Sequence, residues 1–189
     1  APITAPGQAA VSVVRISGEK TADILEKLTP KRYKEIIKNP GTMVFSSILD
    51  LSDGGVLDRG LVVFFISLYS FTGENVAEFH LHVSPYLQSK LIENILSLVS
   101  RLARPCEFSE RAYLNGQVDL AQAEAIADLI AAETSAQAKL AGEQLAGKLS
   151  KAIDTLGEPL RDLLAEIEAH IDFPEEDIEP KTYSHWEEV

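Results

Sequence analysis

The stretch GEQLAGKL, residues 142–149, differs by one residue from a phosphate-binding loop. Gly142, Gly147 and Lys148 fit the G-x-x-x-x-G-K pattern, but a Leu follows where a Ser or Thr should bind Mg²⁺. Such a loop connects a strand to a helix, so that free N–H groups face the phosphates. Here the preceding residues are helix formers, and Glu143 would place a negative charge beside the phosphates. We therefore predict a helix at this stretch and no nucleotide site.

Two further patterns concern metal binding and nucleophilic catalysis. His80 and His82 form an H-x-H pair, a spacing that suits Zn²⁺. A zinc site needs a third and a fourth ligand, and no cluster of Cys and His residues in the sequence supplies them, so we do not expect metal. The lone cysteine, Cys106, has no evident triad partners, and we expect it to be a small buried residue rather than a nucleophile.

Arg15 and Glu78 are the remaining candidates for a polar site. Arg15 lies near the end of the strand-like run VSVVRI, residues 11–16, and Glu78 lies on the polar face of the alternating run VAEFHLHV, residues 76–83. An Arg can hold a carboxylate or carbonyl group by two parallel hydrogen bonds. An ordinary surface ion pair and a solvated carboxylate fit the same residues. The residues alone leave both interpretations open.

The segments that must position these side chains mix strands with helices. We predict strands at residues 11–16, 41–50, 56–67 and 76–83, and helices at residues 19–29 and from 84 to about 102. The turn Ser52-Asp53-Gly54-Gly55 predicts a hairpin between the second and third strands, and Pro85 suits the first turn of a helix. Residues 1–115 therefore indicate an α/β or α+β domain.

After residue 115 the sequence becomes rich in Ala and loses its strand patterns. Residues 119–148 are typical of helix and begin with D-x-x-Q, the spacing of a capping box. We expect a second helix at residues 150–171, kinked at its internal Gly and Pro, and ended by the acidic stretch 172–180. The chain thus predicts a strand-containing domain followed by helices.

Composition excludes several classes of protein. The chain has 189 residues, of which 46% are hydrophobic and 24% charged, as is ordinary for a soluble globular protein. Its apolar runs are too short to cross a bilayer, and no signal peptide is evident. A single Cys suits a reducing compartment. We expect a cytoplasmic protein without a membrane partner, and a fragment, because the chain opens on Ala-Pro rather than Met.

The negative charge is unevenly placed. Residues 1–115 carry 12 of the 17 Lys and Arg residues and 12 of the 29 Asp and Glu residues. The whole net charge of −12 therefore lies in residues 116–189. This asymmetry indicates two units with different surfaces, and the acidic one would repel a phosphate backbone.

Four stretches together resemble one family. They are TAPGQAAVSVVRISG (4–18), SFTGENVAEFHLH (70–82), RPCEFSERAYLNGQVDLAQAEAIADLI (104–130) and LAEIEAHIDFPEED (164–177). Their order and spacing resemble the tRNA-modification GTPase family MnmE (TrmE) up to about residue 179, and the third stretch is highly specific.

The resemblance implies an α+β fold with two parts. Residues 1–115 would form a mixed-sheet, dimerising domain similar to tetrahydrofolate-binding one-carbon enzymes, and residues 116–189 the first part of a helical domain. In the family a GTPase domain is inserted where this chain stops, so GTP, Mg²⁺ and K⁺ would act only through that absent domain. The family is a GTP hydrolase acting in tRNA modification; whether this chain is itself an enzyme stays open.

The resemblance also implies partners and a cofactor. The family forms a homodimer through its N-terminal domain and binds a 5-formyl-tetrahydrofolate-type folate near that interface. With a flavin-dependent partner, MnmG (GidA), it modifies the wobble uridine of certain tRNAs at carbon 5. We expect indirect contact with tRNA here, because the net charge opposes direct binding.

The family's folate contacts fall on Arg15, Glu78 and Gln117 of this sequence. Arg15 is the Arg of the RISG motif, and Glu78 matches the second acid of an FTGEDVVE-type motif. A carboxylate such as Glu78 can accept two hydrogen bonds from the ring N–H and amine of a pterin. Gln117 stands where the family has Lys, so anchoring of an anionic folate should be weaker.

Three family glycine motifs are altered, at Gly7-Gln8-Ala9-Ala10, His82-Val83-Ser84 and Pro105-Cys106-Glu107-Phe108. The lost glycines permit positive φ or close ligand approach, so the changes bear on cofactor affinity more than on the fold. Two alternatives remain: a free-standing folate-dependent one-carbon transferase of the glycine-cleavage type, and a non-catalytic helical scaffold. Whether the gene continues past Val189 into a G-x-x-x-x-G-K-[ST] segment would distinguish the family from these two alternatives, because only the family has a GTPase domain there.

Overall fold

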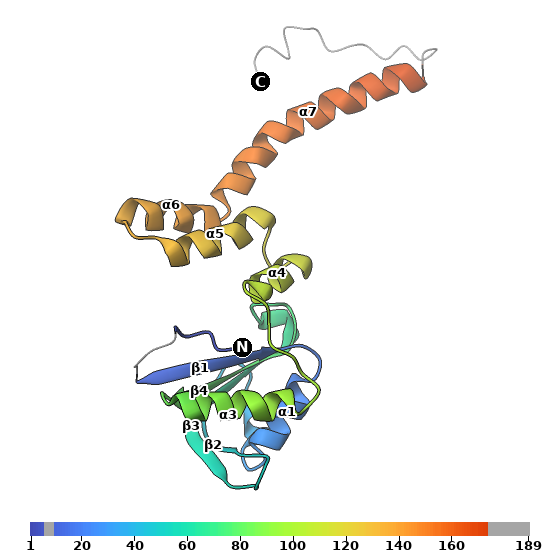
Figure 1. Ribbon diagram of the computed structural model, residues 1–189. Coiled ribbons are helices and arrows are strands. Elements are labelled where there is room, and N and C mark those ends of the chain that lie inside the picture. Colours follow the sequence, from blue (N-terminus) through green and yellow to red (C-terminus); the bar gives the residue numbers. More distant parts are fainter. Residues whose placement is uncertain (6–9, 174–189) are drawn as a thin grey trace. The chain divides into compact units, whose positions relative to one another are not determined.

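The computed structural model describes residues 1–5 and 10–173 (Figure 1). The chain divides into two compact units, Ala1–Val118 and Asp119–Val189. Residues 6–9, and the acidic stretch from residue 174 onward that was expected to follow the last helix, lie outside the described residues.

A four-stranded sheet forms the centre of the first unit. Its strands are β1 (Val11–Ser17), β2 (Val44–Leu49), β3 (Val56–Phe65) and β4 (Val76–His82). Their order is β1-β4-β3-β2, and all three pairs are antiparallel. The α+β class is confirmed, but the mixed strand directions are not found. A short connection joins β3 to β4, whereas parallel neighbours need a crossover of a dozen or more residues.

Helices cover one face of this sheet. They are α1 (Thr21–Leu28), α2 (Tyr33–Lys38) and α3 (Pro85–Leu96), and Figure 1 shows α1 and α3 lying along the sheet. Alternate strand residues such as Val14, Phe79 and Leu81 point into the core between these layers, each at most 2% exposed. Arg15 and Glu78 therefore point to the opposite face.

The helix α3 is shorter than the sequence predicts. It was expected to reach about residue 102, but it ends at Leu96. Val99 then has a φ of 61°, a left-handed conformation that a right-handed helix cannot include and that a β-branched residue rarely adopts. The chain continues through irregular backbone and enters α4 (Glu107–Leu114), whose C-cap is Asn115.

The two edges of the sheet differ. Along β1, Ile3 donates its N–H to Val13 O and Arg15 donates its N–H to Ala1 O, both at 2.9 Å. Among the described residues no strand pairs with the outer side of β2. Inside the sheet, a Cβ on Gly60 would clash with His80 O, so only glycine fits there.

The second unit contains α5 (Leu120–Ala131), α6 (Ser135–Leu145) and α7 (Lys148–Asp172). The predicted capping box at Asp119 is confirmed. A second capping box, which was not predicted, is found at Thr134, whose side chain accepts from the Gln137 N–H and begins a separate helix, α6. The helix α7 runs through Pro159 as one element.

The near-match to a phosphate loop lies in this helical unit. Gly142 is inside α6, and Gly147, with a φ of 81°, connects α6 to α7. The prediction of helix is confirmed for residues 142–145 and 148–149, but the helix is interrupted at Ala146 and Gly147. Every regular element described between residues 119 and 173 is helical. Within the described part of the chain, no helix combines the length and apolar character needed to cross a membrane.

Candidate functional site

Arg15 and Glu78 form an ion pair on the sheet face that the helices leave free. The register of β1 and β4 places the two residues directly opposite each other. Arg15 donates to Glu78 Oε1 from Nε at 2.8 Å, and Arg15 Nη2 lies 2.7 Å from the same oxygen. Their side chains are 22% and 13% exposed. Two of the three sequence-predicted residues are thus brought together and half-buried.

Two aromatic rings lie against this pair. The Arg15 Cζ is 5.6 Å from the centre of the Phe71 ring and 5.4 Å from that of the Phe108 ring, within the range of cation–π attraction. Phe71 follows the short helix η1 (Ser67–Tyr69), and Phe108 belongs to α4. The sequence patterns predicted neither ring as part of a site. Phe71 and Phe108 do lie inside two of the stretches that resemble the family, and that position could have indicated a role in the site.

The ion pair retains unused hydrogen-bonding capacity. Glu78 Oε1 receives Arg15, while Glu78 Oε2 lies 3.4 Å from His80 Nε2. That ring nitrogen is buried, and among the described residues it has no hydrogen-bond partner. Glu78 Oε2 therefore remains available to a donor. Acceptance of a donor pair by both oxygens, as expected from the sequence, would require Oε1 to be shared with Arg15.

Gln117 lies beside the turn that carries Phe71 and does not join the pair. Its N–H donates to Ala112 O at 2.8 Å, and its exposed side chain packs near Gly73. A Cβ on Gly73 would meet Gln117 Cγ at 3.2 Å. Within the described residues, no contact joins Gln117 to Arg15 or Glu78.

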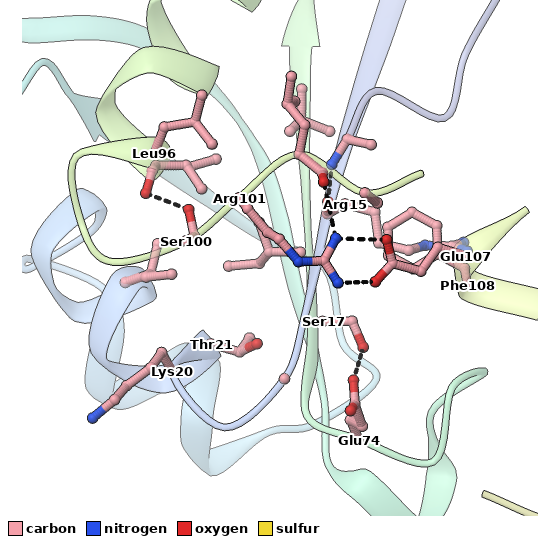
Figure 2. Close-up of a pocket in the computed structure, with 18 of the residues that line it drawn as sticks. Arg15, Ser17, Lys20, Thr21, Glu74, Leu96, Ser100, Arg101, Glu107 and Phe108 are labelled. Carbon is pink, nitrogen blue, oxygen red and sulfur yellow. Dashed lines mark hydrogen bonds and ion pairs between the residues drawn. The ribbon is translucent and has the colours of Figure 1, made fainter. Parts of the chain in front are cut away.

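A chain of polar contacts ties the end of β1 to α4. Ser17 Oγ donates to Glu74 Oε2 at 2.7 Å, and Arg111 Nη1 donates to both Glu74 oxygens at 3.0 and 2.8 Å. Arg111 also donates to Glu107 Oε1, from Nη2 at 2.8 Å. Arg101 completes the chain with two bonds to Glu107, at 2.8 and 2.6 Å, as Figure 2 shows.

Glu107 is the buried centre of this network, with 3% of its side chain exposed. The hydrogen bonds from Arg101, followed by the backbone N–H of Arg104 and the side chain of Arg111, hold the pKa of Glu107 far below its usual range. The pKa of Arg111 is raised, mainly by its hydrogen bond to Glu107 and secondarily by its hydrogen bond to Glu74. Because Phe108 is the next residue, the network also fixes the ring that covers Arg15.

The residue before Glu107 departs from expectation. Cys106 was expected to be buried, and it is exposed instead. It is the N-cap of α4 and has a φ of 59°, in the left-handed region. The chain must turn sharply there to bring Glu107 inward, and glycine adopts that backbone without a Cβ penalty. The glycine that the resemblance implies at this position would fit this backbone.

A cleft of about 630 Å³ opens beside the network (Figure 2). Its polar lining includes Arg15, Ser17, Lys20, Glu74, Arg101 and Arg111, and its apolar lining includes Ile24, Ile92 and Ile95. Glu78 and Gln117 do not line it. The combination of cationic and apolar groups suits an organic anion. Ala1 also lines the cleft.

Metal-binding groups are sparse in the described residues. No cluster of three or more His, Cys, Asp or Glu side chains there has the arrangement to hold a metal ion. His82 of the H-x-H pair instead places Nδ1 3.0 Å from Asp58 Oδ1. His80 lies beside Glu78.

Comparisons with known proteins give consistent matches along the chain. The family described as GTP-binding protein TrmE N-terminus matches residues 1–117, and the family described as MnmE helical domain matches residues 120–189. A Phenylobacterium zucineum protein named tRNA modification GTPase MnmE is 43% identical over 94% of this chain and 39% of its own length. A Methylococcus capsulatus protein of the same name is 46% identical over 93% of this chain and 38% of its own length.

A third relative, from Dechloromonas aromatica and with the same name, is 44% identical over 93% of this chain and 38% of its own length. This chain spans less than two fifths of the length of these relatives. The chain belongs to the MnmE (TrmE) family.

Proposed function

We propose that this chain is the cofactor-binding and dimerising part of a tRNA modification GTPase. In this proposal it binds a 5-formyl-tetrahydrofolate-type folate and supports modification of the wobble uridine at carbon 5, together with the flavoprotein MnmG (GidA), in the cytoplasm. The observation that carries the proposal is the half-buried Arg15–Glu78 pair held against two phenyl rings. Family models over both units argue against the chance match that a helical scaffold would require.

The chemistry of a reduced pterin fits this pair. A pterin is a flat bicycle with an amine and ring N–H as donors and a carbonyl as acceptor. Glu78 Oε2 is free to accept one of those donors, and Arg15 Nη1 is not used in its bonds to Glu78. Phe71 and Phe108 offer ring faces and edges nearby. These residues therefore suit recognition of the pterin, with no new charge left unpaired.

The remainder of a folate suits the adjoining cleft. Its benzoyl group needs apolar surface and its glutamate needs cations. The cleft that Arg15 lines provides Ile24 and Ile95 for the first, and Lys20 and Arg101 for the second. Because both cations are more than half exposed, we expect them to contribute weak, salt-dependent attraction.

Calorimetric titration with 5-formyl-tetrahydrofolate tests this assignment. A charge-assisted hydrogen bond contributes about 1.5–3 kcal/mol, so Glu78→Ala should weaken binding about tenfold or more. Glu78→Gln keeps the size and should also weaken binding, because it loses the charge. Glu93→Ala, on the exposed side of α3, is the matched control. Wild-type affinity in both Glu78 variants would show that the site is assigned to the wrong residues.

The Gln117→Lys variant tests the family departure. The added cation should tighten folate binding, and more strongly at low salt, where screening is weaker. If the wild type shows no binding and Gln117→Lys restores it, a real site has been disabled by the Lys-to-Gln change. Absence of binding in both proteins would refute folate binding by this chain.

We also propose that the first unit forms the homodimer, through residues 66–71. This segment exposes Ile66, Leu68 and Tyr69 by 44%, 79% and 83%, next to Phe71. Such a run of exposed apolar side chains beside a candidate site is suited to a second copy of the chain. Sedimentation should show a dimer that Leu68→Lys dissociates, while Leu140→Lys on α6 does not. A wild-type monomer at high micromolar concentration would contradict the proposal.

GTP, Mg²⁺ and K⁺ belong, in this proposal, to a GTPase domain outside residues 1–189. Neither matched family description is that of a GTPase domain. We propose that tRNA is reached with the help of the flavoprotein partner. Copurification of tagged chain with MnmG, followed by loss of the complex on adding excess untagged chain, would support this assembly.

A further inference from the structure

A second, smaller cleft lies at the outer edge of β2, on the strand that has no neighbour on that side among the described residues. Its volume is about 380 Å³, and it is lined by Lys31, Arg32, Phe45, Ser46, Ser47 and Arg59. None of these residues lines the cleft beside Arg15. The two clefts therefore present separate surfaces of the first unit.

The surroundings of this cleft are basic although the whole chain is acidic. Residues 27–38 carry five cationic side chains and one acid, in a chain of net charge −12. The cations are Lys27, Lys31, Arg32, Lys34 and Lys38, and all are exposed. Arg32 pairs with Glu35 at 2.6 Å, and no ion pair is formed by Lys31 or Arg59 with any described residue. Unneutralised cations of this kind attract phosphates.

Phe45 adds an aromatic surface to the same place. It is 59% exposed on the sheet face opposite the helices. The β2–β3 register sets Ser47 opposite Arg59, and both share that face with Phe45. Lys31 reaches the cleft from the connection between α1 and α2. Cations beside an exposed ring are the combination that binds unpaired nucleotides, by phosphate contact and base stacking.

We propose that this basic cleft binds an unpaired RNA segment, with phosphates against Lys31 and Arg59 and one base stacked on Phe45. The cleft has room for about one or two nucleotides, and α2, the described helix next to Lys31 and Arg32, has only 6 residues and is too short to read a duplex groove. The acid excess of the chain lies in residues 116–189, whereas residues 27–38 are basic, so the overall charge that led us to expect only indirect contact with tRNA does not describe this cleft. RNA is also the class of molecule in the names of the relatives.

An acidic peptide that adds a strand to β2 is the main rival occupant. Backbone pairing would give it affinity, and its specificity would come from alternating side-chain pockets. The exposed ring of Phe45 and the hydroxyl group of Ser47 on the same sheet face favour nucleotide binding instead.

Fluorescence anisotropy of the full chain with a labelled RNA hairpin tests the proposal. The hairpin should carry an unpaired loop, and a fully paired RNA of the same length is the comparison probe. We expect the hairpin to bind more tightly than the paired RNA. Phe45→Ala should weaken hairpin binding at least about fivefold and leave the paired RNA unchanged. Lys31→Ala and Arg59→Ala should each make the slope of log K against log salt concentration less steep by about 0.7, because each variant loses one phosphate contact.

Lys139→Ala and Lys151→Ala, in α6 and α7, are the matched controls and should bind RNA as the wild type does. Circular dichroism checks that each variant is folded, and folate titration should be unchanged in the Phe45 variant. The proposal is overturned by absence of hairpin binding at low salt, by equal losses in cleft and control variants, or by indifference to Phe45→Ala. It is also overturned if a Glu-rich peptide binds the cleft and RNA does not displace it.

Discussion

Replacing Glu107 by Gln removes a buried charge while keeping the size of the side chain. Five hydrogen bonds reach this carboxylate, two from Arg101, two from Arg111 and one from the N–H of Arg104. Bonds to a charged group contribute about 1.5–3 kcal/mol each, but they do not add, and the 61% exposed Arg101 is screened. We expect Glu107→Gln to lower the free energy of unfolding by about 3 kcal/mol.

The expected loss depends on pH in a definite direction. The pKa of Glu107 is lowered in the folded state, whereas in the unfolded chain it is about 4.3. The charged carboxylate therefore stabilises the fold fully above about pH 4.3, and this contribution is lost as the pH falls toward the folded pKa. The Gln variant lacks the ionisation. The difference between wild type and variant should shrink once the pH falls below about 4.

Urea unfolding followed by circular dichroism measures both effects, and hydrogen exchange of peptides from β4 assigns the transition to the first unit. Glu110→Gln is the control, because Glu110 lies on the same helix, is 46% exposed and pairs only with Arg104 among the described residues. It should cost less than about 0.5 kcal/mol. Equal losses in the two variants, or a Glu107→Gln difference that persists in acid, would refute the reasoning.

Three other expectations follow from backbone geometry. Cys106→Gly should raise the free energy of unfolding by about 1 kcal/mol, because the φ of 59° is strained for a side chain, while Cys106→Ala should bring no gain in urea unfolding. Gly60→Ala should cost more than about 2 kcal/mol through its clash with His80 O, whereas Gly54→Ala, with open space around it, should cost about 1 kcal/mol. A fluorescent GTP analogue should not bind the chain at micromolar concentration, because Gly142 is inside α6; saturable binding would contradict this.

Local sequence patterns predicted the helices and strands better than they predicted which of them lie side by side in the fold. The alternation of β4 placed Glu78 and Phe79 on opposite faces, and the structure agrees. That Arg15 faces Glu78 depends on the pairing of β1 with β4, across 63 residues, which periodicity does not specify. The resemblance supplied that association instead. The rings of Phe71 and Phe108 were missed for the same reason, since they meet Arg15 only through the tertiary fold.

The failures at element ends have local physical causes. α3 ends early although its apolar pattern continues, because Val99 adopts a left-handed conformation that the pattern does not encode. The break before α6 was predictable, since Thr134 and Gln137 have capping-box spacing. Cys106 was expected to be buried because cysteines commonly are, but its position at a sharp turn into α4 exposes it.

The strand order β1-β4-β3-β2 has a consequence for the order of folding events. β2, β3 and β4 pair with sequence neighbours, so their loops close at small entropic cost. Among the four described strands, β4 is the one partner of β1, and the pair that contains Arg15 and Glu78 closes a loop of 63 residues. Contacts between distant residues form late, since loop closure must precede them. In a chain that has formed only the β2–β3 and β3–β4 pairs, Glu78 is in place before Arg15 lies beside it, and we expect the candidate site to form when β1 docks onto β4.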